Sequence, residues 1–208
     1  MSHMVKPIFI TFEGIEGCGK STQIKLLESY LKSKGVPTLL TREPGGTAIG
    51  EKIRQVLLNK DFKEMHPTTE LLLYASARAQ HVHQLILPAL KGGKIVLCDR
   101  YADATKAYQG DARGIDKTLL KNIHKIATDN LQPVLTFLLD CPVEIGLGRA
   151  QDRNRFEEEK ISFHKKVRKG YLKIAKAEPK RVKIIDATQT RDAVHQEIAD
   201  YVEKYIGS

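Results

Sequence analysis

The sequence has no tryptophan, only 6% aromatic residues, and three cysteines without a short pairing such as Cys-x-x-Cys. An odd number of widely spaced cysteines argues against a disulfide framework and against a thiolate zinc site, and it fits a reducing compartment. No run approaches the ~18 consecutive apolar residues of a membrane span, and the first residues lack the apolar core of a secretory signal. We therefore expect a cytoplasmic protein with no membrane partner, and we draw nothing from residues 1–3, which fit a cloning scar.

Positive charge is what the chain has in excess, with a formal net charge of +9 and a pI of about 9.4. Such a balance favours polyanionic partners, either nucleic acid or phosphorylated small molecules. Ten of the Lys and Arg residues lie in 160–183 with a single acid, among apolar residues at helical spacing. This pattern favours a solvated helix face over a nucleic-acid groove, because few aromatic rings are available for bases to stack on. We expect no nucleic-acid partner.

The 208 residues, 41% of them hydrophobic, are enough for one domain with a full core over 1–208. Short apolar runs alternate with longer helical patterns, as a parallel sheet with crossover helices requires, so the predicted class is α/β. The five predicted strands are 7–14, 38–42, 92–100, 133–140 and 181–187. The predicted helices, besides the basic one above, are 19–34, 47–58, 67–90, 103–109, 116–130 and 193–205.

The stretch GIEGCGKST, which follows the first predicted strand and opens the first predicted helix, has the spacing of a phosphate-binding loop. Glycines let successive backbone N–H groups point at phosphate oxygens, and the helix N-terminus adds partial positive charge. Lys20 can then reach the terminal phosphates of ATP, and the Ser21 hydroxyl can ligate Mg²⁺. The predicted loop comprises Gly14, Ile15, Glu16, Gly17, Cys18, Gly19, Lys20, Ser21 and Thr22. The predicted fold is a P-loop NTPase-type three-layer sandwich with a five-stranded parallel sheet.

A second acidic site is expected near the loop, because Mg²⁺ on the β- and γ-phosphates of ATP needs a carboxylate close by. The stretch KIVLCDR provides Asp99 at the end of a buried strand, and the next residue, Arg100, can pair with a phosphate. These residues leave three classes open: a GTPase, a nucleic-acid-driven ATPase and a small-molecule kinase. The GTPase is disfavoured, because no guanine-reading Asn-Lys-x-Asp motif occurs late in the chain.

Two further motifs, TREPGGT after the second strand and DRYADATKAYQG after the third, carry a family resemblance. With FEGIEGCGKSTQ, LLLYASARAQHV and GRAQDRNRFE in the same order, the whole chain resembles thymidylate kinases of the bacterial type. The resemblance implies a homodimer that transfers the γ-phosphoryl of Mg·ATP to thymidine 5′-monophosphate (dTMP), giving dTDP and ADP for dTTP biosynthesis. Another nucleoside monophosphate kinase and a P-loop ATPase stimulated by nucleic acid remain as alternatives.

The resemblance also implies how the acceptor sugar and phosphate are held. Glu16 is similar to the carboxylate that holds the acceptor sugar near its 3′-hydroxyl. Arg54 and Arg100 correspond to clamps on the acceptor phosphate. Tyr108 and Gln109 correspond to residues that crowd the sugar and favour deoxyribose.

The thymine base is expected to meet three side chains by the same resemblance. Tyr74 stands where the family usually has a phenylalanine stacked on thymine, and a tyrosine ring can also stack. Arg78 and Thr105 correspond to hydrogen-bonding partners of the base edge.

A short mobile lid is expected at 149–157, where GRAQDRNRFE resembles the segment that carries catalytic arginines in the bacterial type. The candidates for neutralising charge on the moving phosphoryl group are Arg149, Arg153 and Arg155, with Arg153 as first choice. This segment is a few residues shorter than in bacterial relatives, and Asn154 stands where they have aspartate.

Overall fold

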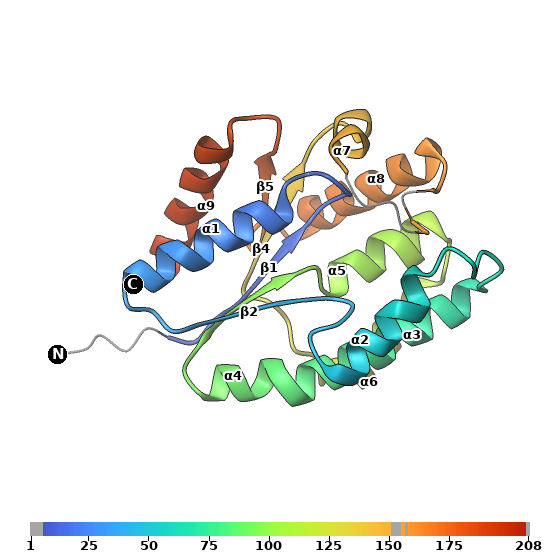
Figure 1. Ribbon diagram of the computed structural model, residues 1–208, viewed down its shortest axis with the longest axis horizontal. Coiled ribbons are helices and arrows are strands. Elements are labelled where there is room, and N and C mark those ends of the chain that lie inside the picture. The colour runs from blue at the N-terminus through green and yellow to red at the C-terminus, as the bar shows by residue number, and fades with distance from the viewer. Residues whose placement is uncertain (1–5, 151–154, 157, 207–208) are drawn as a thin grey trace.

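The computed structural model describes residues 6–150, 155–156 and 158–206. Five parallel strands form one sheet in the order β2-β3-β1-β4-β5, as Figure 1 shows. The strands are β1 (Phe9–Glu13), β2 (Thr38–Arg42), β3 (Ile95–Asp99), β4 (Leu135–Asp140) and β5 (Val182–Asp186). Each lies within or at the stretch that the sequence predicts, and the α/β class with a five-stranded parallel sheet is confirmed.

The central strand β1 is buried along its whole length, because neighbours cover both of its edges and both of its faces. Phe9 pairs with Val96 on one face of the sheet, and Ile10 belongs to the opposite face. A parallel strand covered on both sides has no polar face to present, which explains the continuous apolar run in the sequence.

The face of Ile10 is covered by α1 (Lys20–Ser33) and α9 (Arg191–Ile206), which pack against each other (Figure 1). Ile24, Leu27 and Leu31 of α1 recur at helical spacing and are buried in this layer. The helix that leaves the phosphate-binding loop is therefore anchored directly on the sheet.

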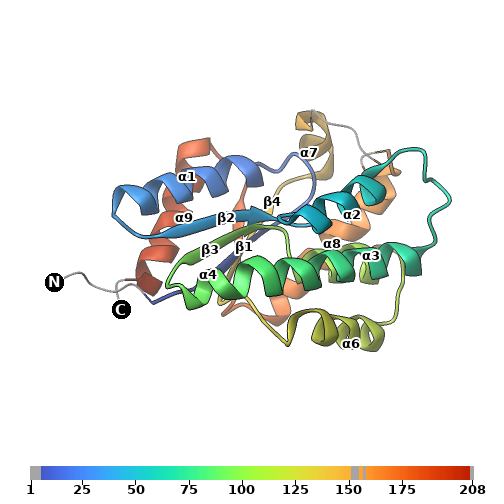
Figure 2. The ribbon, with the colours of Figure 1, turned by 60° about the horizontal axis from the view of Figure 1, so that its bottom comes forward.

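The opposite face is covered by a longer series of helices, and Figure 2 shows several of them on the far side of the sheet from α1. They are α3 (Pro67–His81), η1 (Val82–Ile86), α4 (Leu87–Lys91), α5 (Ala102–Thr105), η2 (Lys106–Ala112), α6 (Lys117–Thr128) and α8 (Ile161–Ala177). The helices α2 (Ala48–Leu58) and α7 (Val143–Arg149) lie at the carboxyl edge of the sheet, α2 against α3. The sequence interpretation did not include α7.

The predicted helix 67–90 is present as α3, η1 and α4, but its middle is a π-helical turn. That turn ends at Ile86, two residues before Pro88, which has no N–H for the carbonyl of Gln84 and whose ring would collide with that carbonyl. Widening the helix by one residue accommodates the proline without ending the helix. A second π-helical segment, η2, extends the predicted helix 103–109 to Ala112.

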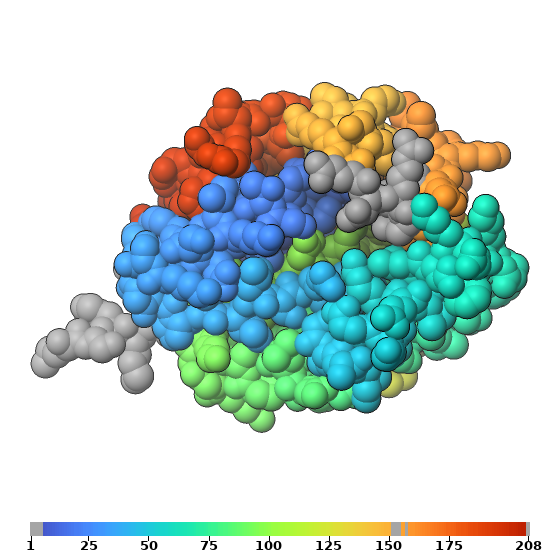
Figure 3. Space-filling model, in the orientation of Figure 1, coloured from blue at the N-terminus to red at the C-terminus, as the bar shows by residue number. Residues whose placement is uncertain are grey.

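The carboxyl ends of β1, β2 and β3 meet at one edge of the sheet, where α2 and α3 project beyond the strands (Figure 1). Figure 3 shows this edge hollowed between α1 and the residues of α2. Within the described part of the chain, no helix combines the length and the apolar character that crossing a membrane requires.

Candidate active site

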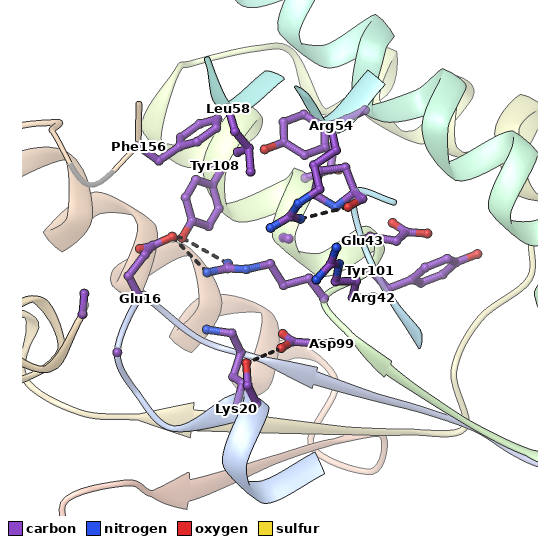
Figure 4. Close-up of a pocket in the computed structure, with 18 of the residues that line it drawn as sticks. Glu16, Lys20, Arg42, Glu43, Arg54, Leu58, Asp99, Tyr101, Tyr108 and Phe156 are labelled. Carbon is purple, nitrogen blue, oxygen red and sulfur yellow. Dashed lines mark hydrogen bonds and ion pairs between the residues drawn. The ribbon is translucent and has the colours of Figure 1, made fainter. Parts of the chain in front are cut away.

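A cleft of about 900 Å³ opens at the carboxyl edge of the sheet and is drawn in Figure 4. Most of the predicted site residues line it: Glu16, Gly17, Gly19, Lys20, Ser21, Thr22, Arg54, Tyr74, Arg78, Asp99, Arg100, Thr105, Tyr108, Gln109 and Arg149. Gly14, Ile15 and Cys18 form the buried back of the loop. The fold thus brings together side chains that the sequence spreads from residue 16 to residue 149.

The loop between β1 and α1 has the geometry of an anion cradle. Gly17 has a φ of 68°, and a Cβ there would lie 1.9 Å from the carbonyl oxygen of Gly146, so no other residue fits. Helix α1 begins without a side-chain cap and without an acid in its first turn, which leaves its N-terminus suited to an anion. The Lys20 Nζ donates to the carbonyl oxygens of Ile15 at 2.7 Å and Gly14 at 3.1 Å, which holds the amino group across the loop.

Ser21 and Asp99 both line the cleft, and the Ser21 hydroxyl donates to Asp99 Oδ2 at 2.9 Å; Asp99 is labelled in Figure 4. A hydroxyl and a carboxylate are hard oxygen ligands of the kind Mg²⁺ prefers, and Mg²⁺ usually completes its shell with waters and phosphate oxygens. Among the described residues, no group of three or more His, Cys, Asp or Glu side chains could hold a metal. The Ser21–Asp99 pair next to a phosphate loop therefore fits Mg²⁺ that arrives with a nucleotide.

Glu16 and Arg100 both line the cleft and form an ion pair, and Figure 4 labels Glu16 with its dashed contacts. Arg100 Nη2 donates to Glu16 Oε1 at 2.9 Å, and the Tyr108 hydroxyl donates to the same oxygen at 2.6 Å. Burial by itself would raise the pKa of the Glu16 carboxyl, but Arg100 and the other donors around it outweigh burial and hold that pKa well below its usual value. Glu16 is therefore a carboxylate that Arg100 and Tyr108 fix in place.

Arg100 has a left-handed backbone with φ of 70°, which is uncommon outside glycine and tends to occur at functional sites. Its main-chain N–H donates to Phe12 O at 2.9 Å, which anchors the residue to β1. The side chain also donates to the hydroxyls of Tyr108 at 3.1 Å and Tyr171 at 3.3 Å. The guanidinium is thus fixed between Glu16 of the loop, η2 and α8.

The far end of the cleft is formed by α2, α3 and α5. Arg54 of α2 donates through Nη1 to Pro44 O at 2.9 Å, while Tyr74 of α3 adds an aromatic wall. Arg78, also from α3, donates through Nη1 to Thr105 Oγ1 at 3.0 Å. A flat ring, two guanidinium groups and a hydroxyl in one recess can hold a planar base that carries a phosphate.

The three candidate arginines of the lid have different positions. Arg149 ends α7, donates through Nη1 to Ala187 O at 3.1 Å and borders the cleft. Arg153 lies outside the described residues. Arg155 does not line the cleft: its Nη2 donates to Glu70 Oε2 at 2.6 Å and its Nε to Leu57 O at 3.1 Å. The structure therefore fixes Arg155 to α2 and α3, because Glu70 is an almost fully buried counter-ion.

A smaller hollow of about 320 Å³ adjoins the phosphate loop on the other side of Arg149. It is lined by Cys18, Gly19, Thr22, Gln23, Arg149, Ala187, Gln189, Arg191 and Val194. Sequence reasoning missed this part of the site, because the loop after β5 carries no motif and reaches α1 only through the fold.

Sequence reasoning also missed several residues of the main cleft. Glu43 and Pro44 come from the REPGGT motif and line the cleft, so their signal was present in the quoted motif. Phe156 lines it too, with its ring 6.2 Å from the Tyr74 ring and 5.8 Å from the Tyr108 ring, centre to centre. No periodicity in the sequence predicts that contact.

Comparison with known proteins agrees with this geometry. A family model described as Thymidylate kinase matches residues 12–198. A thymidylate kinase of Geotalea uraniireducens is 56% identical over 87% of this chain and 89% of its own length, and one of Syntrophotalea carbinolica is 54% identical over 89% and 90%. The crystal structure of thymidylate kinase from Ehrlichia chaffeensis superposes with a TM-score of 0.77 at 36% identity, covering 94% of this chain and 98% of that one.

Proposed function

The chain belongs to the thymidylate kinase family and phosphorylates dTMP with ATP, and we propose that the cleft at the carboxyl edge of the sheet is where it does so. The observation that supports this location is the arrangement of one continuous cleft. A phosphate cradle with Lys20 and the Ser21–Asp99 pair lies at one end, and a recess with Arg54 and Tyr74 lies at the other. The two alternative functions are not favoured, since relatives at 46–56% identity are named thymidylate kinases.

ATP would bind with its triphosphate in the loop and its base in the smaller hollow. Backbone N–H groups of the loop and the Lys20 amino group would face the phosphates, and Arg149 lines both cavities. Arg149 and Arg191 line the hollow and can pack their guanidinium planes on a purine. Mg²⁺ bound at Ser21 and Asp99 would neutralise charge on the β- and γ-phosphates.

The acceptor dTMP would bind in the opposite end of the cleft. Its base would stack on Tyr74, and Arg54 and Arg100 would pair with its phosphate. Glu16, held by Arg100 and Tyr108, would accept a hydrogen bond from the sugar 3′-hydroxyl. Arg78 and Thr105 would hydrogen-bond the edge of the base, and Gln109 would lie beside the sugar.

Phosphoryl transfer in this cleft needs no covalent enzyme intermediate. An oxygen of the acceptor phosphate attacks the γ-phosphorus in line, the bond from that phosphorus to the β–γ bridging oxygen breaks, and the products are ADP and dTDP. Lys20 and Arg100 offset the repulsion between the two negatively charged phosphate groups that must come into contact. Among the lid candidates, Arg149 already borders both cavities, and Arg155 would first have to leave Glu70; Arg153 remains a prediction.

A coupled assay of ADP release tests the site and the acceptor together. With Mg·ATP, we expect turnover with dTMP to exceed turnover with UMP, CMP, AMP and GMP. Lys20→Ala should lower kcat by about 10²–10³-fold, because it removes one charged donor from the transferring phosphoryl group. Lys32→Ala on the solvent side of α1 is the control and should leave kcat unchanged. Wild-type-like turnover by the Lys20 variant would refute this location of the reaction.

The protein would act as a homodimer in the cytoplasm. Five apolar side chains on α2, α3 and α6 are exposed and form what we call the apolar face: Ile49, Val56, Leu72, Leu119 and Ile126. Both α2 and α6 pack against α3, so these side chains belong to neighbouring helices. A second copy of the chain would cover them. The three cysteines are all buried free thiols, which supports a reducing compartment.

A further inference from the structure

Arg78 is held in the base recess by an unusually complete set of contacts. Its side chain is 4% exposed, its Nε donates to Glu43 Oε2 at 2.7 Å, and its Nη2 donates to Tyr101 O at 3.0 Å. With the bond to Thr105, three of its five N–H donors are occupied, which leaves one on each terminal nitrogen. A guanidinium cannot accept a hydrogen bond, so the remaining donors require an acceptor atom on whatever base lies in the recess.

Glu43 orients the guanidinium because both of its own oxygens are held. Arg78 occupies Oε2, and His81 Nδ1 lies 3.0 Å from Oε1. Burial would raise the pKa of the Glu43 carboxyl, but the charge of Arg78 and the contact with His81 outweigh burial and keep that pKa below its usual value. A carboxylate fixed at two points cannot rotate, and neither can the guanidinium that it holds.

One hydrogen of His81 is placed by the Glu43 carboxylate. A carboxylate can only accept, so the Nδ1 of His81 must carry a hydrogen and donate to Glu43. The other ring nitrogen, Nε2, is hydrogen-bonded to the Thr41 hydroxyl at 2.7 Å, so both nitrogens of the ring are held. His81 is fully buried, and the backbone of Gly46 packs closely against its ring, since a Cβ on Gly46 would lie 2.7 Å from the ring.

We propose that His81 and Glu43 are positioning residues that fix Arg78 as a donor, and that the chain Thr41–His81–Glu43–Arg78 selects pyrimidines with a carbonyl oxygen at C4 over those with an amino group there. The inference rests on the proposed binding of the acceptor base in this recess. An amino group opposite Arg78 would leave two donors facing each other. A buried, immobile donor cannot turn away from that clash, whereas a loosely held arginine could.

The test compares kcat/KM for dTMP and dCMP in two variants of one residue. His81→Leu removes the donor to Glu43, whereas His81→Asn keeps an amide N–H close to the position of Nδ1. We expect the dTMP/dCMP ratio to fall at least about tenfold in the leucine variant, on the scale of one misplaced polar contact, and to stay within about threefold of wild type in the asparagine variant.

A purely structural role for His81 gives a different result, because loss of folded enzyme lowers both acceptors by the same factor. An unchanged ratio in His81→Leu, or an equal fall in both variants, would overturn the proposal. If His81→Leu does not fold, Thr41→Val, which removes only the hydroxyl hydrogen-bonded to His81 Nε2, must lower the dTMP/dCMP ratio in its place. A wild-type enzyme that uses dTMP and dCMP equally would also overturn it, whereas no turnover of dTMP would contradict the proposed function itself.

Discussion

Glu13 ends β1 with a carboxylate that is buried beneath the cleft. Its Oε1 accepts from the main-chain N–H of Tyr101 at 2.7 Å, and its Oε2 accepts from the Tyr171 hydroxyl at 2.8 Å. Burial, together with the nearby charge of Asp103, raises the pKa of Glu13 to about 7, although Arg100 and the two donors act in the opposite direction. Glu13 therefore links the segment around Arg100 to β1 and α8 through hydrogen bonds. Keeping its carboxyl ionised in the folded protein is unfavourable, so its contribution to stability depends on pH.

The raised pKa of Glu13 predicts how the stability of the fold changes with pH. The folded protein holds the Glu13 proton more tightly than the unfolded chain, whose glutamates titrate near 4.3, so the free energy of unfolding should fall as pH rises from about 4.5 to 7. The expected total is about 4 kcal/mol, since one pKa unit corresponds to ~1.4 kcal/mol. The fall should continue through pH 7, where the folded carboxyl is half-protonated, and level off above about pH 8. Urea unfolding at pH 5, 6, 7 and 8 measures it.

Glu13→Gln is the matched control, because the amide keeps the shape and loses the titration. Its free energy of unfolding should change less between pH 5 and 8 than that of the wild type. Glu16 and Glu43 have lowered pKa values, and their contributions are lost only at more acidic pH. Parallel profiles for wild type and variant would show that Glu13 is not the titrating group.

Among the elements, α7 supports the phosphate loop through its backbone. Helix α7 packs so closely on the loop that a Cβ on Gly146 would lie 2.6 Å from Glu16 O and 2.9 Å from Ile15 Cδ1. Gly148, two residues further along the same helix, has no neighbouring atom within 4 Å of a Cβ. The two glycines therefore separate the effect of packing from the effect of helix propensity.

Opposite changes in stability are expected from the same substitution at these two sites. Gly146→Ala should lower the free energy of unfolding by about 1–3 kcal/mol and raise KM for ATP, because the loop must move to admit the methyl group. Gly148→Ala should raise the free energy of unfolding by up to ~1 kcal/mol, because alanine restricts the unfolded chain and favours the helix. Chemical unfolding and steady-state kinetics measure both. Similar effects at the two positions would contradict the contact between α7 and the loop.

For the molecule as a whole, the apolar face of α2, α3 and α6 predicts that two copies of the chain form a dimer through this face. Leu72 is 50% exposed and Ile126 is 79% exposed, values that are unfavourable for side chains of this size unless another surface covers them. Leu72→Glu combined with Ile126→Glu should convert a dimer into a monomer, as measured by sedimentation at micromolar concentration. Ile184→Lys on the edge strand β5 adds a charge to another exposed apolar site and should leave the dimer intact. Sedimentation of the wild type as a monomer would refute the predicted dimer.

The sequence by itself determined the sheet, the helices that begin and end with clear signals, and the phosphate loop. These features depend on short-range spacing: alternating apolar runs, a glycine after α1, and Lys20 and Ser21 at a fixed distance from Gly14. The pairing of Ser21 with Asp99 was predictable as well, because parallel strands bring their carboxyl ends to one edge.

Only the tertiary structure decided the partners of the buried charges. Arg155 looks like a phosphate-binding arginine in the sequence, yet it pairs with Glu70, which lies 85 residues away. Arg78, Glu43 and His81 likewise form one network from two separate elements, and nothing local indicates which donor meets which acceptor. The physical reason is that a buried charge must find its counter-charge wherever folding places one, and that position depends on the packing of the whole chain rather than on neighbours in the sequence.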